Sequence, residues 1–548
     1  MTVQKQQVPQ FPSQLLLASE AERGGGTQHL KVPVKHLLTD SCQPPAVAAT
    51  VPAVLSSDRN SAPIAALVPT GENGNLQRLL PRGLDGQIRL VRTSSDRNFV
   101  VVSEHGNACA LAIRSNKLNA LILDGARAEG RLLKKADLIE INDALDAFTE
   151  RYGESAEVWL RVAPLGNGVE IDVGDDQHTR IRITAGKTEV VTAGSDTIFY
   201  RPRSTKAMAM PAAEGNWRLL EKYLNVSPSD AVLLIAWLTY TLAHPKVASS
   251  KYPILVLAGN EGSGKSTLCK NIIIRIIDPS ELGVQVFPHN AKDLAIAGQN
   301  AHVVCFDNVR SFRASMADML CIASTGGSLT TRQLYTDAEQ QAICLHVAVV
   351  LNGIHSFICT PDLSQRCLPI QLIAMDKAGR KSEQDIARDL EAELPVIMRG
   401  LFDLIASIFH HLPSTEITNP ERMIDFVRWL GAMELATSVP SGVYQGLYSE
   451  ALSQGQLDTL MDNPLAAAII EFMDDMKGDI WSDTPSELLI ALRRKIDRGT
   501  EFSREWPQNP IALSKRLSGL QAGLLSQGIA IELSRGKRRV VTLSKVRG

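Results

Sequence analysis

The hydrophobic and polar positions of the 548-residue chain are patterned unevenly along its length. Residues 1–78 show little periodicity, and Pro44–Val54 is rich in proline and alanine, so we expect a mostly disordered tail or linker there. From about residue 79 onward, apolar residues recur at the intervals of strands and helices. The pattern therefore predicts that the folded part of the chain begins near residue 79.

Residues 79–205 predict a small α+β module. Alternating apolar residues indicate strands at Gln87–Arg92 and Asn98–Val102, and the spacing over Ala136–Tyr152 is helical. A meander of further strands is predicted at Val158–Ala163, Gly168–Val173, Thr179–Thr184 and Lys187–Val191. We expect the module to act as a collar for oligomerisation or DNA contact.

Residues 206–380 predict a domain of alternating strands and helices. A helix is expected to begin at Pro228, with Ser227 as its N-cap. The apolar run Pro253–Ala258 predicts a buried strand, and Leu268–Ile277 predicts a helix. Between them lie Gly259, Asn260, Glu261, Gly262, Ser263, Gly264, Lys265, Ser266 and Thr267.

This glycine-rich segment matches the pattern G-x-x-x-x-G-K-[ST] of a phosphate-binding loop (P-loop), in the strand–turn–helix context that the pattern requires. Glycines let successive backbone N–H groups point at phosphate oxygens, and the following helix N-terminus adds partial positive charge. Lys265 is expected to reach the β- and γ-phosphates, and the Ser266 hydroxyl to coordinate Mg²⁺. The segment therefore predicts nucleotide binding.

A second part of the site is expected at Asp307. The run Ala301–Asn308 predicts an apolar strand that ends in this aspartate. A carboxylate at the carboxyl end of a strand beside the glycine-rich segment is placed to hold Mg²⁺. Beyond it, a helix is predicted at Ser315–Ala323, and strands at Ser328–Tyr335 and Gln340–Leu351.

Asn352 and Arg366 are two further catalytic candidates. Asn352 follows a predicted strand and would lie between Asp307 and the γ-phosphate, where it orients the attacking water, although a polar residue before a glycine is also typical of a turn. Arg366 precedes the predicted strand Leu368–Ile373 and would reach the nucleotide of a neighbouring subunit. An arginine in that position raises the rate of phosphoryl transfer ~10³–10⁵-fold. The alternative for Arg366 is a surface salt bridge.

The order of these motifs resembles the ATP-binding proteins of phages, plasmids and integrative elements, which are related to superfamily 3 helicases and to the helicase half of poxvirus-type primase-helicases. The segments that carry the resemblance are Gly259–Thr267, Asp293–Leu294, Ala301–Asn308, Thr325–Asp337, Leu351–Ile354, Pro361–Arg366 and Arg422–Phe426. The likeness covers about residues 155–548. It implies a multidomain α/β protein with an AAA+ ATPase core, generally assembled as a ring, here expected to be a hexamer.

The resemblance also implies roles for single residues. It implies ATP and Mg²⁺ at Lys265, Ser266 and Asp307, sensing at Asn352 and an arginine finger at Arg366. The segment Thr325–Asp337 takes the place of the part that contacts DNA in the ring channel.

Three departures from the family pattern concern Asn308, Gln365 and the channel segment. Gln365 precedes Arg366 where an acid is common, so the local contacts of this arginine are expected to differ from those of the family. Asn308 stands where many relatives have a second acid, which leaves the water-activating carboxylate unassigned, with Glu339 or Asp337 as candidates. These two acids also lie near the expected tip of the channel segment. Arg332 would therefore supply the positive contact to DNA, or else face the nucleotide of the neighbour.

Residues 381–478 predict a helical region, and residues 479–548 a winged helix that binds DNA. The helices of the first are expected at Glu383–Leu394, Val396–His410, Glu421–Leu435 and Pro464–Met476. The second has helices at Thr484–Ile496 and Ile511–Gln527, then strands at Ile529–Leu533 and Val540–Leu543. Its basic residues are Lys515, Arg516, Arg535, Lys537, Arg538 and Arg539. The last helix would enter a major groove while the hairpin touches phosphates, although such domains also serve protein contacts.

Composition narrows the picture further. The formal net charge of −2 confines nucleic-acid contacts to local patches. The eight cysteines form no C-x-x-C pair, so we expect buried free thiols in a reducing cytosol rather than disulfides or structural zinc. The module shows no His or Cys cluster at ligand spacing, and its aspartates are typical of turns. Without a signal pattern or an apolar run of ~18 residues, a cytoplasmic protein with no membrane contact is expected.

These predictions favour a DNA-dependent ring ATPase, either a helicase or a replication-initiation motor of a mobile element. It would hold single-stranded DNA in its channel and duplex DNA at the winged helix, and any primase or polymerase would be a separate partner. The alternative is a nucleotide-switched DNA-binding assembly that remodels DNA or serves defence without unwinding. A metabolic or signalling NTPase is a third possibility.

Overall fold

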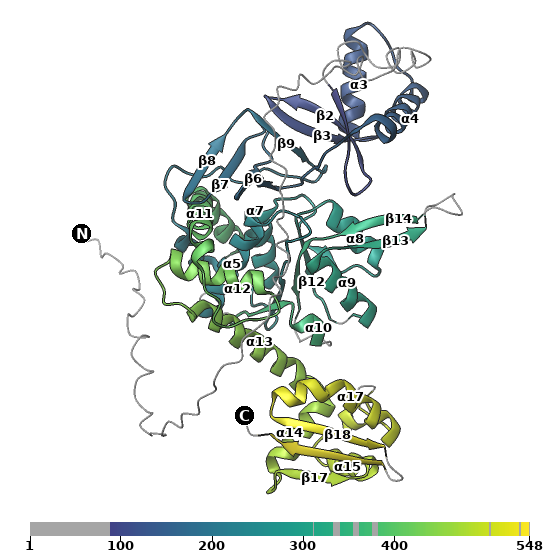
Figure 1. Ribbon diagram of the computed structural model, residues 1–548, viewed down its shortest axis with the longest axis vertical. Helices are drawn as coiled ribbons and strands as arrows, with labels where there is room; N and C mark the ends of the chain where they lie inside the picture. Colours follow the sequence, from purple (N-terminus) through teal and green to yellow (C-terminus); the bar gives the residue numbers. More distant parts are fainter. Residues whose placement is uncertain are drawn as a thin grey trace, which may run out of the picture. The chain divides into compact units, whose positions relative to one another are not determined.

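The computed structural model describes residues 88–546, apart from 311, 333–339, 354–360, 375–381, 504–505 and 536–538. The predicted tail at 1–78 therefore lies outside the described residues, as do Asp337, Glu339, Lys537 and Arg538. The described helices and strands build a mixed α/β fold (Figure 1). Among the residues that the structure covers, no helix has the length and apolarity that crossing a membrane requires.

The first sheet has the order β4-β1-β2-β3-β9. Its strands are β1 (Ile88–Arg92), β2 (Asn98–Glu104), β3 (Asn107–Ala112), β4 (Glu154–Ser155) and β9 (Ser195–Tyr200). Strand β2 is antiparallel to both β1 and β3, while β4 is parallel to β1 and β9 is parallel to β3. Helices α3 (Asn116–Ala128) and α4 (Lys135–Tyr152) bury Leu118, Ile122, Ile141 and Leu145 in one cluster with apolar residues of β1, β2 and β3. The helix α3 and the strands β3 and β9 were not predicted.

A separate antiparallel meander has the order β5-β6-β7-β8. Its strands are β5 (Val162–Leu165), β6 (Gly168–Asp172), β7 (Arg180–Thr184) and β8 (Lys187–Val191). The strand predicted over Val158–Ala163 begins too early, because Trp159 forms only an isolated bridge with Phe199. The buried residues of the meander belong to one hydrophobic cluster with helices α5 (Pro228–Ala243) and α11 (Glu383–His411), so the meander contributes to the central core.

The central sheet is parallel, with the order β11-β12-β15-β10-β16. Its strands are β10 (Ile254–Ala258), β11 (Gln285–Val286), β12 (Val303–Asp307), β15 (Ala348–Asn352) and β16 (Cys367–Gln371). The three middle strands are almost wholly buried, as expected for a parallel sheet with both faces covered. Because all five strands run the same way, their carboxyl ends lie at one edge, where ligands bind in open α/β sheets.

The single strand predicted over Gln340–Leu351 is wrong, because two strands occupy that range. β14 (Gln340–Leu345) pairs antiparallel with β13 (Gly327–Arg332), and β15 joins the central sheet. The break falls at His346, whose ring bonds the Ser250 carbonyl at 3.0 Å, and at Val347, whose N–H donates to the Ala323 carbonyl. Figure 1 shows β13 and β14 as a ribbon that projects beyond helix α8 (Ala291–Gln299). The run from Ala342 to Leu351 is apolar apart from His346, so the change of sheet was missed.

The helical region also differs from the prediction at one proline. Two helices were expected on either side of Pro395, but α11 is continuous from Glu383 to His411. Leu394 before the proline and Ile397 after it are both buried in the central cluster, so packing outweighs the lost backbone hydrogen bond. Helices α12 (Ile424–Ala436) and α13 (Val443–Met461) follow, and α13 was not predicted.

The C-terminal part builds a helical layer on a three-stranded antiparallel sheet of order β17-β19-β18. Its elements are α14 (Pro464–Asp475), β17 (Ile480–Asp483), α15 (Pro485–Arg493), α16 (Arg498–Glu501), α17 (Pro510–Ser526), β18 (Ile529–Arg535) and β19 (Arg539–Lys545). Their buried residues form one hydrophobic cluster that includes Ile469 of α14, Leu513 of α17 and Leu543 of β19. The predicted helices and hairpin are present, and β17 adds a third strand that was not expected.

Candidate nucleotide site

The glycine-rich segment follows β10 directly and leads into a continuous helical stretch, α6 (Lys265–Thr267), η2 (Leu268–Ile273) and α7 (Ile274–Ile277). Gly262 and Gly264 have φ angles of 75° and 90°, which residues that carry a Cβ rarely adopt. Gly264 is also the N-cap of the helical stretch. Asn225 braces the segment, because its side-chain amide donates to the Ser263 carbonyl at 2.9 Å and to the Ile373 carbonyl.

Lys265 is largely buried by the loop that precedes it. Its ammonium donates to the carbonyl oxygens of Gly259 at 2.7 Å and Asn260 at 2.9 Å. Burial lowers the pKa of Lys265, while the charges of Asp307 and Glu261 oppose that shift. The loop therefore holds a cationic group against its own backbone, close to the carboxylate of Asp307.

Three polar side chains meet beside Lys265. The Ser266 hydroxyl donates to Asp307 Oδ2 at 2.9 Å, and the Asn352 amide donates to Asp307 Oδ1 at 2.7 Å. Asn352 Nδ2 is also 3.4 Å from Ser266 Oγ. The sheet order explains the cluster: β15, which ends in Asn352, lies between β10 and β12, which ends in Asp307.

The cluster offers a hydroxyl oxygen and a carboxylate oxygen, the hard ligands that Mg²⁺ prefers. Ser266 and Asp307 would therefore hold a divalent cation, and Asn352 would orient the Asp307 carboxylate. The residue after Asp307 is Asn308, which has a left-handed φ of 53° and donates its N–H to Asp307 Oδ1 at 2.8 Å. No second carboxylate follows Asp307 directly.

A cavity of about 720 Å³ opens at this cluster. It is lined by the segment from Glu261 to Leu268, by Asp307 and Asn352, and by Asn225 and the exposed Arg310. Sequence reasoning missed Asn225 and Arg310. Arg310 stands three residues after Asp307, and that spacing is the signal that would have placed it near the phosphate-binding edge.

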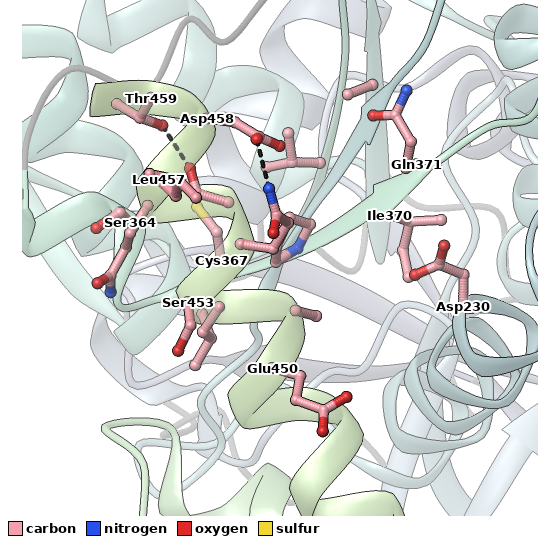
Figure 2. Close-up of a pocket in the computed structure, with 18 of the residues that line it drawn as sticks. Asp230, Ser364, Cys367, Ile370, Gln371, Glu450, Ser453, Leu457, Asp458 and Thr459 are labelled. Carbon is pink, nitrogen blue, oxygen red and sulfur yellow. Dashed lines mark hydrogen bonds between the residues drawn. The ribbon is translucent and has the colours of Figure 1, made fainter. Parts of the chain in front are cut away.

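A larger cavity of about 940 Å³ lies between α5, β16 and α13. Figure 2 shows its acidic side chains Asp230, Glu450 and Asp458, and burial raises the pKa of Asp230. The α13 residues around it are held by bonds within the helix, such as the one from Gln454 to Asp458 at 2.7 Å. An acidic lining disfavours phosphate groups, so size alone does not identify the nucleotide site.

Arg366 lies far from the Lys265 cluster of its own chain. The Ile254 N–H donates to the Arg366 carbonyl at the amino end of β10, whereas the glycine-rich segment leaves the carboxyl end. Five residues of strand separate the two ends, roughly 16 Å. Arg366 Nε contacts Asp362 at 3.4 Å, and Asp362 also pairs with Arg422 at 2.6 Å.

The predicted DNA contacts are only partly described. Arg332 is the last residue of β13 and lies opposite Gln340 of β14 in the strand register. Arg535 and Arg539 are backbone partners in the β18–β19 hairpin. Lys515 and Arg516 are exposed on α17, and Arg539 is exposed at the start of β19. The six described cysteines are free, and Cys109, Cys269, Cys305 and Cys367 are buried as expected. The expectation of burial is wrong for Cys344, which is exposed, and Cys321 is only half-buried.

Two family models match the chain. Residues 218–452 match the model described as the actinomycete integrative conjugative element replication protein, and residues 465–548 match the RepA C-terminal domain of the same elements. From residue 218 onward the chain is thus similar to the replication proteins, RepA, of actinomycete integrative conjugative elements. This match confirms the expected resemblance to proteins of mobile elements. No curated protein matches the chain.

Solved structures show only loose overall similarity. The active helicase Cch of SCCmec type IV is 11% identical, with 84% of this chain and 93% of that chain covered at a TM-score of 0.39. The C-terminal region of NrS-1 is 10% identical, with coverages of 86% and 98% and a TM-score of 0.36. The JCV helicase is 15% identical, with coverages of 41% and 61% and a TM-score of 0.20. At these TM-scores the likenesses carry no argument about function.

Proposed function

We propose that this chain is an ATP-hydrolysing DNA motor, a helicase or replication-initiation ATPase of an integrative element. The observation that carries the proposal is the meeting of Ser266, Asp307 and Asn352 beside Lys265, at the carboxyl ends of three adjacent parallel strands. The match to replication proteins of conjugative elements supports the DNA-processing role. A metabolic NTPase would have no need of a replication-protein C-terminal domain.

Each residue of the site has a proposed task. The N–H groups of Glu261–Thr267 bind phosphate oxygens. The Lys265 ammonium exchanges its hydrogen bonds to the Gly259 and Asn260 carbonyls for contacts with the β- and γ-phosphates. Ser266 and Asp307 would hold Mg²⁺, which would supply positive charge against the charge that develops on the phosphates. Asn352, already bonded to Asp307, orients the attacking water.

The location of Arg366 supports a ring of subunits. An arginine at the amino ends of the strands does not serve the phosphate site of its own sheet, because that site lies at the opposite edge. We propose that Arg366 completes the site of a neighbour in a homo-oligomer, expected to be a hexamer, and stabilises transition-state charge there. Asp362 and Arg422 would set the orientation of Arg366.

We propose that DNA contacts come from two places. Arg332, at the end of β13, would reach single-stranded DNA in the ring channel or the nucleotide of a neighbour. Residues 479–548 would act as a winged helix, with Lys515 and Arg516 in a duplex groove and Arg539 of the hairpin on phosphates. The further division into a tail (1–78), a collar module (79–205), an AAA+ core (206–380) and a helical region (381–478) belongs to the same proposal, as does cytoplasmic location.

Turnover and strand displacement test this function together. The purified chain should hydrolyse ATP with Mg²⁺, accelerate on adding DNA, and displace the strand of a forked duplex. Lys265→Ala should lower the turnover by at least ~100-fold, since its cation is lost from the transition state. Lys270→Ala is the matched control, because Lys270 is an exposed lysine on the following helix and should keep full activity. ATP turnover by Lys265→Ala at the wild-type rate would refute the site.

A second candidate function has one observation in its favour. Asn308 occupies a left-handed position next to Asp307, where a second acid is common among the proteins that the sequence resembles. Without an acid there, hydrolysis would be slow, as suits a nucleotide-controlled DNA-binding switch. DNA-stimulated ATP turnover with no strand displacement on any fork would favour the switch over the motor.

A further inference from the structure

Side chains of metal-ligand type meet at Glu104, Cys109 and His178 in the first part of the described chain. The expectation that this module holds no His and Cys cluster is therefore wrong. Cys109 Sγ lies 2.9 Å from His178 Nδ1, whereas Glu104 Oε2 lies 2.6 Å from Nε2. Because the thiol and the carboxylate contact opposite nitrogens of the ring, the three side chains form a hydrogen-bonded chain and do not converge on one point. The cavity beside Lys265 offers a better-defined ligand site.

That cavity continues past the phosphate-binding loop along the helical stretch that follows it. Its lining there consists of Thr267, Leu268, Asn271 and Ile272, and the two residues between these pairs do not line it. Residues four apart lie on one face of a helix, so the cavity runs along a single face of the stretch. At about 1.5 Å per residue, Ile272 lies roughly 10 Å beyond Lys265. Phosphates bind at the helix N-terminus, which leaves this face for the rest of a nucleotide.

Apolar side chains from four parts of the fold line the same cavity. They are Tyr223 at the end of the 3-10 helix η1 (Trp217–Tyr223), Ile272 of η2, Leu372 after β16 and Ile386 of α11. Ile272 and Leu372 are 2% and 3% exposed and belong to the packed core, whereas Tyr223 and Ile386 are half-buried and leave surface for a ligand. Such a surface suits the flat, apolar faces of a nucleobase better than it suits a phosphate group.

The Tyr223 ring is held in place from α11. Its hydroxyl donates to Glu393 Oε2 at 3.0 Å, and the ammonium of Lys222 pairs with the same carboxylate. Burial and the Glu393 carboxylate raise the pKa of Tyr223, so the phenol keeps the proton that it donates. These bonds tie η1 to α11 and fix Tyr223 relative to Ile386 before any ligand arrives.

Asn271 is the amide of this lining that remains available to a ligand. The amides of Asn225 and Asn352 donate to the Ser263 carbonyl and to the Asp307 carboxylate. The half-buried side chain of Asn271 forms no hydrogen bond with the residues that the structure describes. A carboxamide offers one acceptor oxygen and an NH₂ donor side by side, the arrangement that pairs with the edge of an adenine base.

We propose that this part of the cavity is an adenine subsite, in which the base contacts Tyr223 and Ile386 and its edge is read by Asn271. The inference rests on the proposed function, because it concerns the nucleotide whose phosphates the Lys265 loop binds. Asn271 Oδ1 accepts from the exocyclic amine of adenine, and Asn271 Nδ2 donates to the adjacent ring nitrogen. Guanine presents two acceptors, N7 and O6, on the corresponding edge, so it loses one of these bonds. The subsite therefore selects adenine nucleotides over guanine nucleotides.

Equilibrium binding to the full-length chain tests the reading of the base. Calorimetry with Mg²⁺ and the β,γ-imido analogues of ATP and GTP measures affinity without turnover. The wild type should bind the ATP analogue at least ~5-fold more tightly than the GTP analogue, and Asn271→Leu should bind the two alike. Lys270→Ala is the matched control, because Lys270 is the exposed neighbour that does not line the cavity, and it should keep the wild-type preference. An unchanged preference in Asn271→Leu would overturn the role of Asn271.

Tripolyphosphate separates the base subsite from the phosphate loop. Tyr223→Ala should weaken the ATP analogue at least ~5-fold and leave the affinity for tripolyphosphate unchanged, which also shows that the variant is folded. Tyr223→Phe keeps the ring and should restore binding of the analogue. Lys265→Ala should weaken both ligands. Wild-type affinity of Tyr223→Ala for the ATP analogue would overturn the subsite and leave the nucleotide-binding function standing, whereas a wild type that binds neither ligand would overturn both.

Discussion

Single side chains decide the candidate nucleotide site, and their roles follow from where strands end. Asp307 and Asn352 are each the last residue of a buried strand, so the rule that ligands bind at the carboxyl ends of parallel strands places them together. The hydrogen bonds to Asp307 from Asn352 at 2.7 Å and from Ser266 at 2.9 Å agree with that expectation. Asn225 was missed because no periodic pattern marks a residue that lines a cavity from a loop, whereas Arg310 was marked only by its place three residues after Asp307.

Lys246 gives a prediction for the dependence of stability on pH. Its ammonium donates to the carbonyls of Gly298 and Ala301, and burial lowers its pKa to about 7. The unfolded chain therefore binds more protons than the folded chain between pH 7 and about 10, and stability should rise with pH there by up to ~1.4 kcal/mol per unit. Below pH 7 both states are protonated and the slope from this group vanishes.

Replacing Lys246 with methionine should remove this slope. The urea midpoint of the wild type should rise from pH 7 to pH 9 relative to that of Lys246→Met. The exposed neighbour Lys251 provides the control, and Lys251→Met should follow the wild type at every pH. Parallel curves for the wild type and Lys246→Met would show that Lys246 keeps its ordinary pKa.

Among the elements, α11 shows how packing outweighs local preference. The proline at 395 predicts a break, yet the helix continues because apolar residues on both sides of it are buried in the same cluster. The carbonyl of Pro395 accepts from the Ala212 N–H, and that of Val396 accepts from the Asn216 N–H. Backbone hydrogen bonds from the segment that leads into the 3-10 helix η1 (Trp217–Tyr223) therefore stabilise α11 near its proline.

This contact gives a prediction for Gly400 of α11. A Cβ at Gly400 would lie 2.2 Å from the Trp217 nitrogen and 2.6 Å from the Asn216 carbonyl carbon, both of them backbone atoms. Gly400→Ala should therefore destabilise the fold by roughly 1–3 kcal/mol, because backbone moves less readily than a side chain. Gly519→Ala is the control, since a Cβ there meets nothing within 4 Å, and it should be neutral or stabilising by ~0.5–1 kcal/mol. Equal unfolding midpoints for the two variants would contradict this account.

The C-terminal helix and hairpin give a prediction for DNA affinity. Replacing Lys515, Arg516 and Arg539 together with alanine should weaken duplex binding and reduce the slope of log affinity against log salt by about 0.9 for each lost phosphate contact. A control that removes the same charge elsewhere combines Arg127→Ala, Lys187→Ala and Arg388→Ala, all at exposed positions. Fluorescence anisotropy at several salt concentrations measures both slopes. If the two triple variants bind alike, the DNA-binding face lies elsewhere.

For the assembled protein, the test concerns Arg366 acting across subunits. Arg366→Ala should bind ATP normally and lose ~10³-fold or more in turnover. Mixing it with Lys265→Ala should restore activity, because about a quarter of random interfaces then combine an intact loop with an intact arginine. Arg428→Ala removes an exposed arginine of α12 and should leave turnover unchanged. If mixtures stay as inactive as their components, the finger does not act in trans.

Local chemistry and periodicity were enough to predict the glycine-rich segment with its strand and helix, the aspartate and asparagine at strand ends, and the basic C-terminal hairpin. Each of these depends on residues close together in the chain, where turn geometry, caps and alternation act directly. The division of one apolar run between two sheets at His346, the continuation of α11 through Pro395 and the meeting of Cys109 with His178 were settled by folding alone. They depend on which distant segments bury each other, because burial energy is shared by the whole core and leaves no period in the sequence.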